Sequence, residues 1–125
     1  MRIEKLRQVS IKADDLDKTS DFYEHILGAR RVARYDPPGL LFFDLDGTRL
    51  LFEQNGTPTT LYFWVDDIDA ACEELTSKGV ALESPPHMIF KDDAGTFGPA
   101  GEGEWMAFFK DPSGNMMAFA SRKPC

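Results

Sequence analysis

The chain has 125 residues, of which 42% are hydrophobic and 28% are charged, a composition typical of an ordinary soluble globular protein of about one domain. Its formal net charge of -7 argues against a nucleic-acid or anionic-membrane partner, because both need a basic face. Residues 1–7 lack the apolar core of a signal peptide, and no apolar run reaches the roughly 18 residues that span a bilayer, so we expect a cytoplasmic protein.

The first half of the chain predicts one strand, one helix and then three strands. Polar and apolar residues alternate over 7–13, as in a half-buried strand. Asp15 or Asp17 can cap the helix that follows, and Gly28 ends it. The three strands are expected at 30–35, 40–45 and 49–54, with turn sequences at 36–39 and at Asp46-Gly47 between them.

The second half repeats this order. A strand at 60–65 leads through Asp66-Asp67 into a helix over 67–78, as the first strand leads through Asp14-Asp15 into its own helix. The later elements are expected as a strand at 80–83, a segment at 87–91, a loop at 92–104 that could fold over a ligand, a strand at 105–110, a turn at 111–115 and a strand at 116–121. Each half, at about 60 residues, would be marginal alone. We therefore expect one domain, 1–125, built of two modules at about 1–55 and about 58–125, with a cleft where they meet.

Several short motifs in this order resemble one family. They are Asp15-Leu16-Asp17, Phe22-Tyr23, Leu27-Gly28 and the closing run Phe109-Lys110-Asp111-Pro112-Ser113-Gly114-Asn115. Together they resemble the vicinal oxygen chelate superfamily, which is the glyoxalase, bleomycin-resistance and extradiol-dioxygenase group. The resemblance implies an α+β fold of two tandem βαβββ modules, whose mixed sheets curl into an open barrel with the binding site inside. It also implies a homodimer.

Metal-using members of the superfamily bind a divalent metal through four side chains, and the resemblance places these positions on the present chain. They fall on Gln8, on Leu51 or Glu53, on Thr60 and on Ala118. Only Gln8 and Glu53 are strong donors among them, so we expect no metal or other cofactor. A displaced metal site of Gln8, Glu53 and His87 is the alternative. The two cysteines, Cys72 and Cys125, are too few for a thiolate zinc site or a disulfide framework.

Strand alternation then predicts which side chains line the cavity. If Gln8, Thr60 and Ala118, the positions that the resemblance supplies, mark the cavity face, alternation adds Ser10, Tyr62, Trp64 and Met116, with Lys12 and Ala120 on the same face. Trp105, at the end of the long loop, is a further ligand-binding candidate. This lining is aromatic and soft, which suits a flat or apolar ligand held by stacking. Tyr62 and Trp64 can equally be large core side chains, and Trp105 either closes the mouth of the cavity or covers the edge of the core.

Two functions of different classes remain open. One is a metal-free protein that binds a small aromatic or amphipathic molecule, with an acidic surface that favours cationic compounds. The other is a lyase- or isomerase-type enzyme, or a dioxygenase relative, in which His87 and Glu53 are catalytic. Against the second, His87 can be a structural histidine and Glu53 can begin a solvated linker between the modules.

Overall fold

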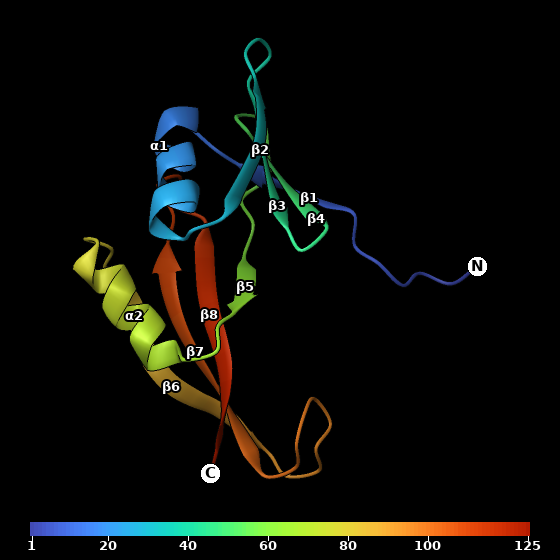
Figure 1. Cartoon of the computed structure of the whole chain (residues 1–125), viewed down its shortest axis with the longest axis vertical. Helices are drawn as coiled ribbons and strands as arrows, with labels where there is room; N and C mark the ends of the chain where they lie inside the picture. The colour runs from blue at the N-terminus through green and yellow to red at the C-terminus, as the bar shows by residue number, and fades with distance from the viewer. The chain divides into compact units, whose positions relative to one another are not determined.

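The computed structural model describes all residues, 1–125, and contains two four-stranded sheets with short helices (Figure 1). The elements are β1 (Gln8–Lys12), α1 (Leu16–Asp21), η1 (Phe22–Ile26), β2 (Arg30–Tyr35), β3 (Leu40–Leu45), β4 (Thr48–Glu53), β5 (Leu61–Trp64), α2 (Ile68–Ser77), β6 (Leu82–Asp92), β7 (Glu102–Lys110) and β8 (Met116–Pro124). The α+β class and the repeated βαβββ order are confirmed. Each sheet is open, and neither closes into a barrel.

The chain divides into two compact units. The first unit comprises Met1–Thr59 and Asp111–Asn115, and the second unit comprises Thr60–Lys110 and Met116–Cys125. No helix of the structure has the length and apolar character that a membrane crossing requires.

In the first unit the strand order is β1-β4-β3-β2, with β1 parallel to β4 and the other neighbours antiparallel. One face of this sheet packs on α1 and η1 and forms an aromatic core. The ring of Tyr23 lies 4.4 Å from that of Phe52, and Phe43 and Phe52 meet edge to face at 5.8 Å. All three side chains are buried, which holds the helix against the sheet.

The first helix begins and ends differently from a simple α-helix. Asp15, rather than Asp17, is its N-cap, because the Asp15 carboxylate accepts a hydrogen bond from Lys18 N at 3.0 Å. From Phe22 onward the helix widens into the π-helix η1, and Leu27 N donates to Phe22 O at 3.0 Å. Sequence periodicity does not distinguish this turn from an α-helical one.

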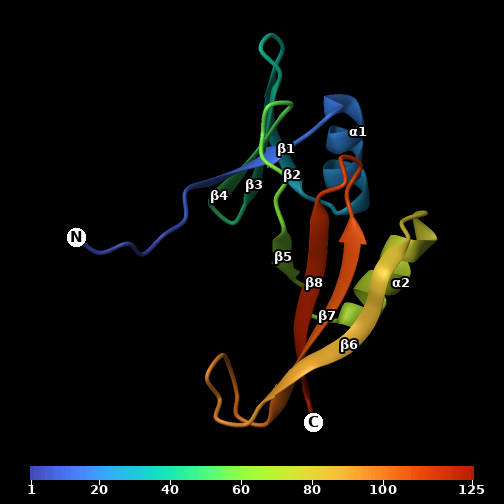
Figure 2. The same cartoon turned by 180° about the vertical axis from the view of Figure 1, so that it is seen from behind.

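The second unit repeats the arrangement, with strand order β5-β8-β7-β6 and β5 parallel to β8. Asp67 caps α2 by accepting from Ala70 N at 3.1 Å, and Ile68, Cys72 and Leu75 are buried on its inner side. Unlike the two separate segments expected from the sequence, β6 is one strand that continues through Pro85 and Pro86 (Figure 2). It is an edge strand, where a proline costs no ladder hydrogen bond. The predicted loop at 92–104 therefore shrinks to 93–101.

Candidate binding site

The face of the first sheet that points away from α1 carries three of the predicted site residues. Paired positions place Gln8, Arg49, Asp44 and Arg30 in one row, and Ser10, Leu51 and Phe42 in the next. A third row begins with Lys12 and Glu53. We call this surface the first open face. Gln8 and Ser10 are exposed and Glu53 is half-buried, so all three predicted residues lie on the same side of the sheet.

The corresponding face of the second sheet, which we call the second open face, carries mainly aromatic and other apolar side chains. One row contains Trp64, Ala120, Met106 and His87, and the next contains Tyr62, Ala118, Phe108 and Ser84. Tyr62 is 58% exposed and Trp64 is 61% exposed, so these rings are not core side chains of the second unit. Tyr62 meets Phe108 edge to face at 6.1 Å.

The exposed Trp64 ring is held in place by its own neighbour in the chain. Its indole Nε1 donates a hydrogen bond to the Asp66 carboxylate at 3.2 Å. A fixed aromatic surface loses little side-chain entropy when a ligand stacks on it.

His87 lies on the second open face with its ring orientation set by the backbone. Its Nδ1 is 2.8 Å from Pro85 O and 3.2 Å from Ser84 Oγ. A carbonyl oxygen can only accept, so the neutral imidazole carries its proton on Nδ1. The Nε2 lone pair is then the free acceptor or base. The sequence did not predict Ser84, Met106 or Phe108 as site residues. Met106 and Phe108 pair with Ala120 and Ala118, so the same alternation applied to β7 would have found both.

Trp105 is not on this face. It pairs with Ser121, whereas Met106 pairs with Ala120, so Trp105 points to the opposite side, where α2 lies. Lys123 Nζ sits 4.5 Å above its ring and also binds Asp69 of α2 at 2.7 Å. The two remaining candidates lie at strand ends, Thr60 just before β5 and Met116 at the start of β8.

The four metal positions of the superfamily do not fit a divalent cation here. Ala118 offers only a methyl group, and Thr60 only a neutral hydroxyl. In the first unit, Gln8 and Glu53 are four residues apart in register, about 13 Å along the strands. Their paired neighbours are the cations Arg49 and Lys12, which would repel a metal ion. No group of three or more His, Cys, Asp or Glu residues is placed to hold one.

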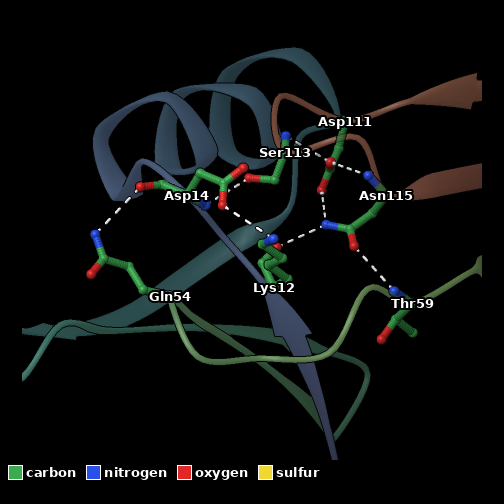
Figure 3. A network of polar contacts seen from close by, with 7 residues as sticks. All are labelled: Lys12, Asp14, Gln54, Thr59, Asp111, Ser113 and Asn115. Carbon is green, nitrogen blue, oxygen red and sulfur yellow. Dashed lines mark hydrogen bonds and ion pairs between the residues drawn. The ribbon is translucent and has the colours of Figure 1, made fainter.

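The turn at 111–115, which belongs to the first unit, forms a buried polar network (Figure 3). The Asp111 carboxylate accepts hydrogen bonds from Tyr23 OH at 2.9 Å, Asn115 Nδ2 at 2.8 Å, and the backbone N–H groups of Ser113 and Asn115, both at 2.9 Å. Burial, and then the adjacent Asp111 charge, raise the pKa of Tyr23 far above its ordinary value. The Tyr23 hydroxyl is therefore a fixed donor, not a catalytic acid.

The same turn fastens the end of β1 (Figure 3). Asn115 Nδ2 donates to Lys12 O at 2.8 Å, and Asn115 Oδ1 accepts from Thr59 N at 3.1 Å. Asp14 N donates to Ser113 Oγ at 2.9 Å. This turn, one of the motifs that carry the family resemblance, thus performs a structural task.

A hollow of about 340 Å³ lies beside the start of α1. Its wall includes Asp15, Asp17 and Asp36, and its cation, Arg34, already binds Asp17 at 2.6 Å and Asp36 at 2.8 Å. Arg34 is therefore already paired, and the wall holds more aspartates than cations.

Comparison with known proteins agrees with this architecture. The profile of the Glyoxalase/Bleomycin resistance protein/Dioxygenase superfamily matches residues 5–119. An antibiotic-binding protein from a Streptomyces species has a similar structure, with 23% identity, 98% of this chain and 99% of that chain covered, and a TM-score of 0.76. A lactoylglutathione lyase from Agrobacterium tumefaciens follows with 20% identity, 96% and 95% coverage, and a TM-score of 0.73.

A virulence protein from Salmonella typhimurium also shares the fold, with 18% identity, 97% and 98% coverage, and a TM-score of 0.76. No curated protein sequence matches the chain significantly. At these identities the structural likeness establishes the fold alone, while the profile covers nearly the whole sequence. The predicted resemblance is confirmed, and the chain belongs to the glyoxalase/bleomycin resistance protein/dioxygenase superfamily.

Proposed function

We propose that the protein binds a small aromatic or amphipathic molecule on its second open face, without the metal site of the superfamily. The observation that carries this proposal is the exposed Trp64 ring, fixed by Asp66, in a row with Met106 and His87. Exposed apolar side chains gain free energy when a ligand covers them. The free His87 Nε2 supplies an acceptor that would orient a donor group of the ligand.

Charge favours a cationic ligand at this face. The second unit has five Lys and Arg against ten Asp and Glu residues, and Asp66 adjoins the Trp64 ring. An aromatic cation would gain from stacking, from the ring quadrupole and from the nearby carboxylate. The shared fold with an antibiotic-binding protein supports a search among aromatic antibiotics.

The test uses proflavine, a planar aromatic cation, followed by tryptophan fluorescence and calorimetry. Trp64→Ala should weaken binding about tenfold, since stacking contributes about 1–3 kcal/mol. Trp105→Phe is the matched control, because Trp105 lies on the opposite face of the sheet. Absence of proflavine binding, or an equal loss in both variants, would contradict the proposal.

The His87 geometry favours a second candidate, a lyase- or isomerase-type reaction. A neutral imidazole whose proton is fixed on Nδ1 has Nε2 ready to accept a proton from a substrate. The predicted catalytic role of Glu53, which is half-buried on the first open face, stays a prediction. The test begins with elemental analysis of protein purified without chelators or a nickel column. Turnover of the hemithioacetal of glutathione and methylglyoxal that disappears in His87→Ala would support the enzyme, and turnover equal in wild type and variant would remove it.

A further inference from the structure

Arg49 is a charged side chain of the first open face with no partner. Its backbone N–H pairs with Arg7 O at 3.0 Å, but its guanidinium makes no hydrogen bond or ion pair. The Nε atom is shielded from solvent and lacks an acceptor, whereas the two terminal nitrogens are not shielded. The arginines of β2, in the same sheet, differ because each of them has a partner: Arg30 with Asp44, Arg31 with Ser20, and Arg34 with Asp17 and Asp36.

The obvious counter-ion does not reach Arg49. Asp44 is its paired position on β3, yet the Asp44 carboxylate lies 3.8 Å from Arg30 and beyond ion-pair distance from Arg49. A partly desolvated guanidinium without an acceptor is costly, and such groups in folded proteins call for an explanation, a bound ligand among them. An anion at the terminal nitrogens would relieve this cost.

The charges and apolar groups beside Arg49 limit the kind of anion. On the first open face Arg30 pairs with Asp44 at 3.8 Å and Lys12 pairs with Asp14 at 3.7 Å, which leaves Arg49 as the one cation of its three rows without a partner. A monoanion matches the single charge of Arg49, while the carboxylates of Asp44 and Glu53 would repel a dianion. In the next row Leu51 is buried, with 9% of its surface exposed, whereas Phe42 is half-buried and meets the exposed Tyr35 ring at 6.1 Å.

We propose that Arg49, together with the Gln8 amide, binds the carboxylate of an amphipathic small molecule whose apolar part lies on the half-buried Phe42. The planar guanidinium fits a carboxylate with two parallel hydrogen bonds, and Gln8 stands beside it in the same row. This inference concerns the first unit and does not depend on the aromatic site proposed for the second.

The test compares 2-naphthoate with 2-naphthamide, which has the same rings but no charge, by titration calorimetry. Wild-type protein should bind the carboxylate about tenfold more tightly than the amide. Arg49→Gln should remove this preference by weakening only naphthoate. The matched control is Arg31→Gln, because Arg31 points to the opposite face and bonds Ser20 at 3.2 Å, and it should keep the preference.

Two further variants separate this inference from the proposed function. Trp64→Ala, which weakens proflavine if the proposed function holds, should leave the preference for naphthoate over naphthamide unchanged, because Trp64 belongs to the second unit. Arg49→Lys keeps the charge but loses the planar fork, so it should retain only part of the preference, and it carries the test if Arg49→Gln fails to fold. Equal affinity of wild type for the two compounds, no binding of naphthoate, or a preference unaltered by replacing Arg49 would overturn the inference.

Discussion

The two units share a framework and differ in the polar groups they bury. Each has the same strand order, a first strand parallel to the last, and an aspartate that caps the helix. The first unit buries Asp111 among the donors of Tyr23 and a turn. The second unit buries Arg122 among Asp92, Glu102 and Glu104, at 2.9, 3.1 and 3.5 Å. The same backbone arrangement thus accommodates a buried carboxylate in one unit and a buried guanidinium in the other.

The open faces diverge in the same way. The first presents an unpaired arginine beside polar and apolar groups, and the second presents aromatic rings and a histidine. The first unit holds nine Lys and Arg against eleven Asp and Glu residues, so the acidity of the chain is concentrated in the second. Net charge, taken over the whole chain, conceals this difference between the two surfaces.

The largest effect is expected from the buried carboxylate of the first unit. Asp111→Ala leaves Tyr23 OH and three N–H donors without their acceptor and should lower the free energy of unfolding by about 3 kcal/mol. Urea denaturation followed by far-UV circular dichroism measures it. Asp93→Ala, at an exposed aspartate, is the control and should change stability little. Equal losses in the two variants would show that the network does not stabilise the first unit.

The second unit should respond to acid through Asp92. The hydrogen bond from Phe97 N, with those from Thr96 N and Arg122, lowers the pKa of Asp92 below its ordinary value of 3.8. Its ionised form therefore stabilises the fold above that pH, and this stability is lost as the pH falls through the lower folded value. Asp92→Asn should lower the melting temperature at neutral pH and flatten its decline between about pH 5 and pH 2.

Tryptophan fluorescence can follow this change, because Trp64 and Trp105 both belong to the second unit. Asp93→Asn, at the next residue, should retain the acid dependence of the wild type. A steep acid decline that survives in Asp92→Asn would assign it to other carboxylates.

The smallest effect tests the likeness of the units. Asp15→Ala and Asp67→Ala each remove one capping hydrogen bond, at 3.0 and 3.1 Å, and each should cost about 1 kcal/mol of unfolding free energy. Asn at either position should restore most of the loss, since its side chain also caps helices. A cost at only one of the two sites would mean that the repeated Asp-Asp pair is not equivalent in the two units.

Local sequence signals were enough to predict the ends of a strand wherever turn residues stand on both sides of it. The strands Arg30–Tyr35 and Leu40–Leu45 are found as predicted, because turn residues on either side delimit them. The same reasoning divided β6 at Pro85-Pro86, since only the sheet order shows that this is an edge strand. It also began β7 too late, at Trp105, and could not tell that this ring faces α2.

Once the resemblance had placed Gln8 and Ala118, alternation was enough to assign Ser10, Tyr62 and Trp64 to the sides of the sheets that face away from the helices. It could not show that Arg49 lacks a partner, because that depends on where the carboxylates of Asp44 and its neighbours come to rest. Nor could it assign the proton of His87, which is fixed by a carbonyl two residues earlier. The binding and catalytic roles of the predicted site residues stay predictions, as do the homodimer and the cytoplasmic location.

The turn at 111–115 makes the first unit discontinuous in the chain. Its residues are translated after nearly all of the second unit, yet they supply the acceptor for Tyr23 and the side chain that holds the end of β1. A fragment ending at Thr59 would bury the Tyr23 hydroxyl without its acceptor. The first unit therefore cannot complete its structure during synthesis until this turn itself has emerged, although most of its own sequence comes first.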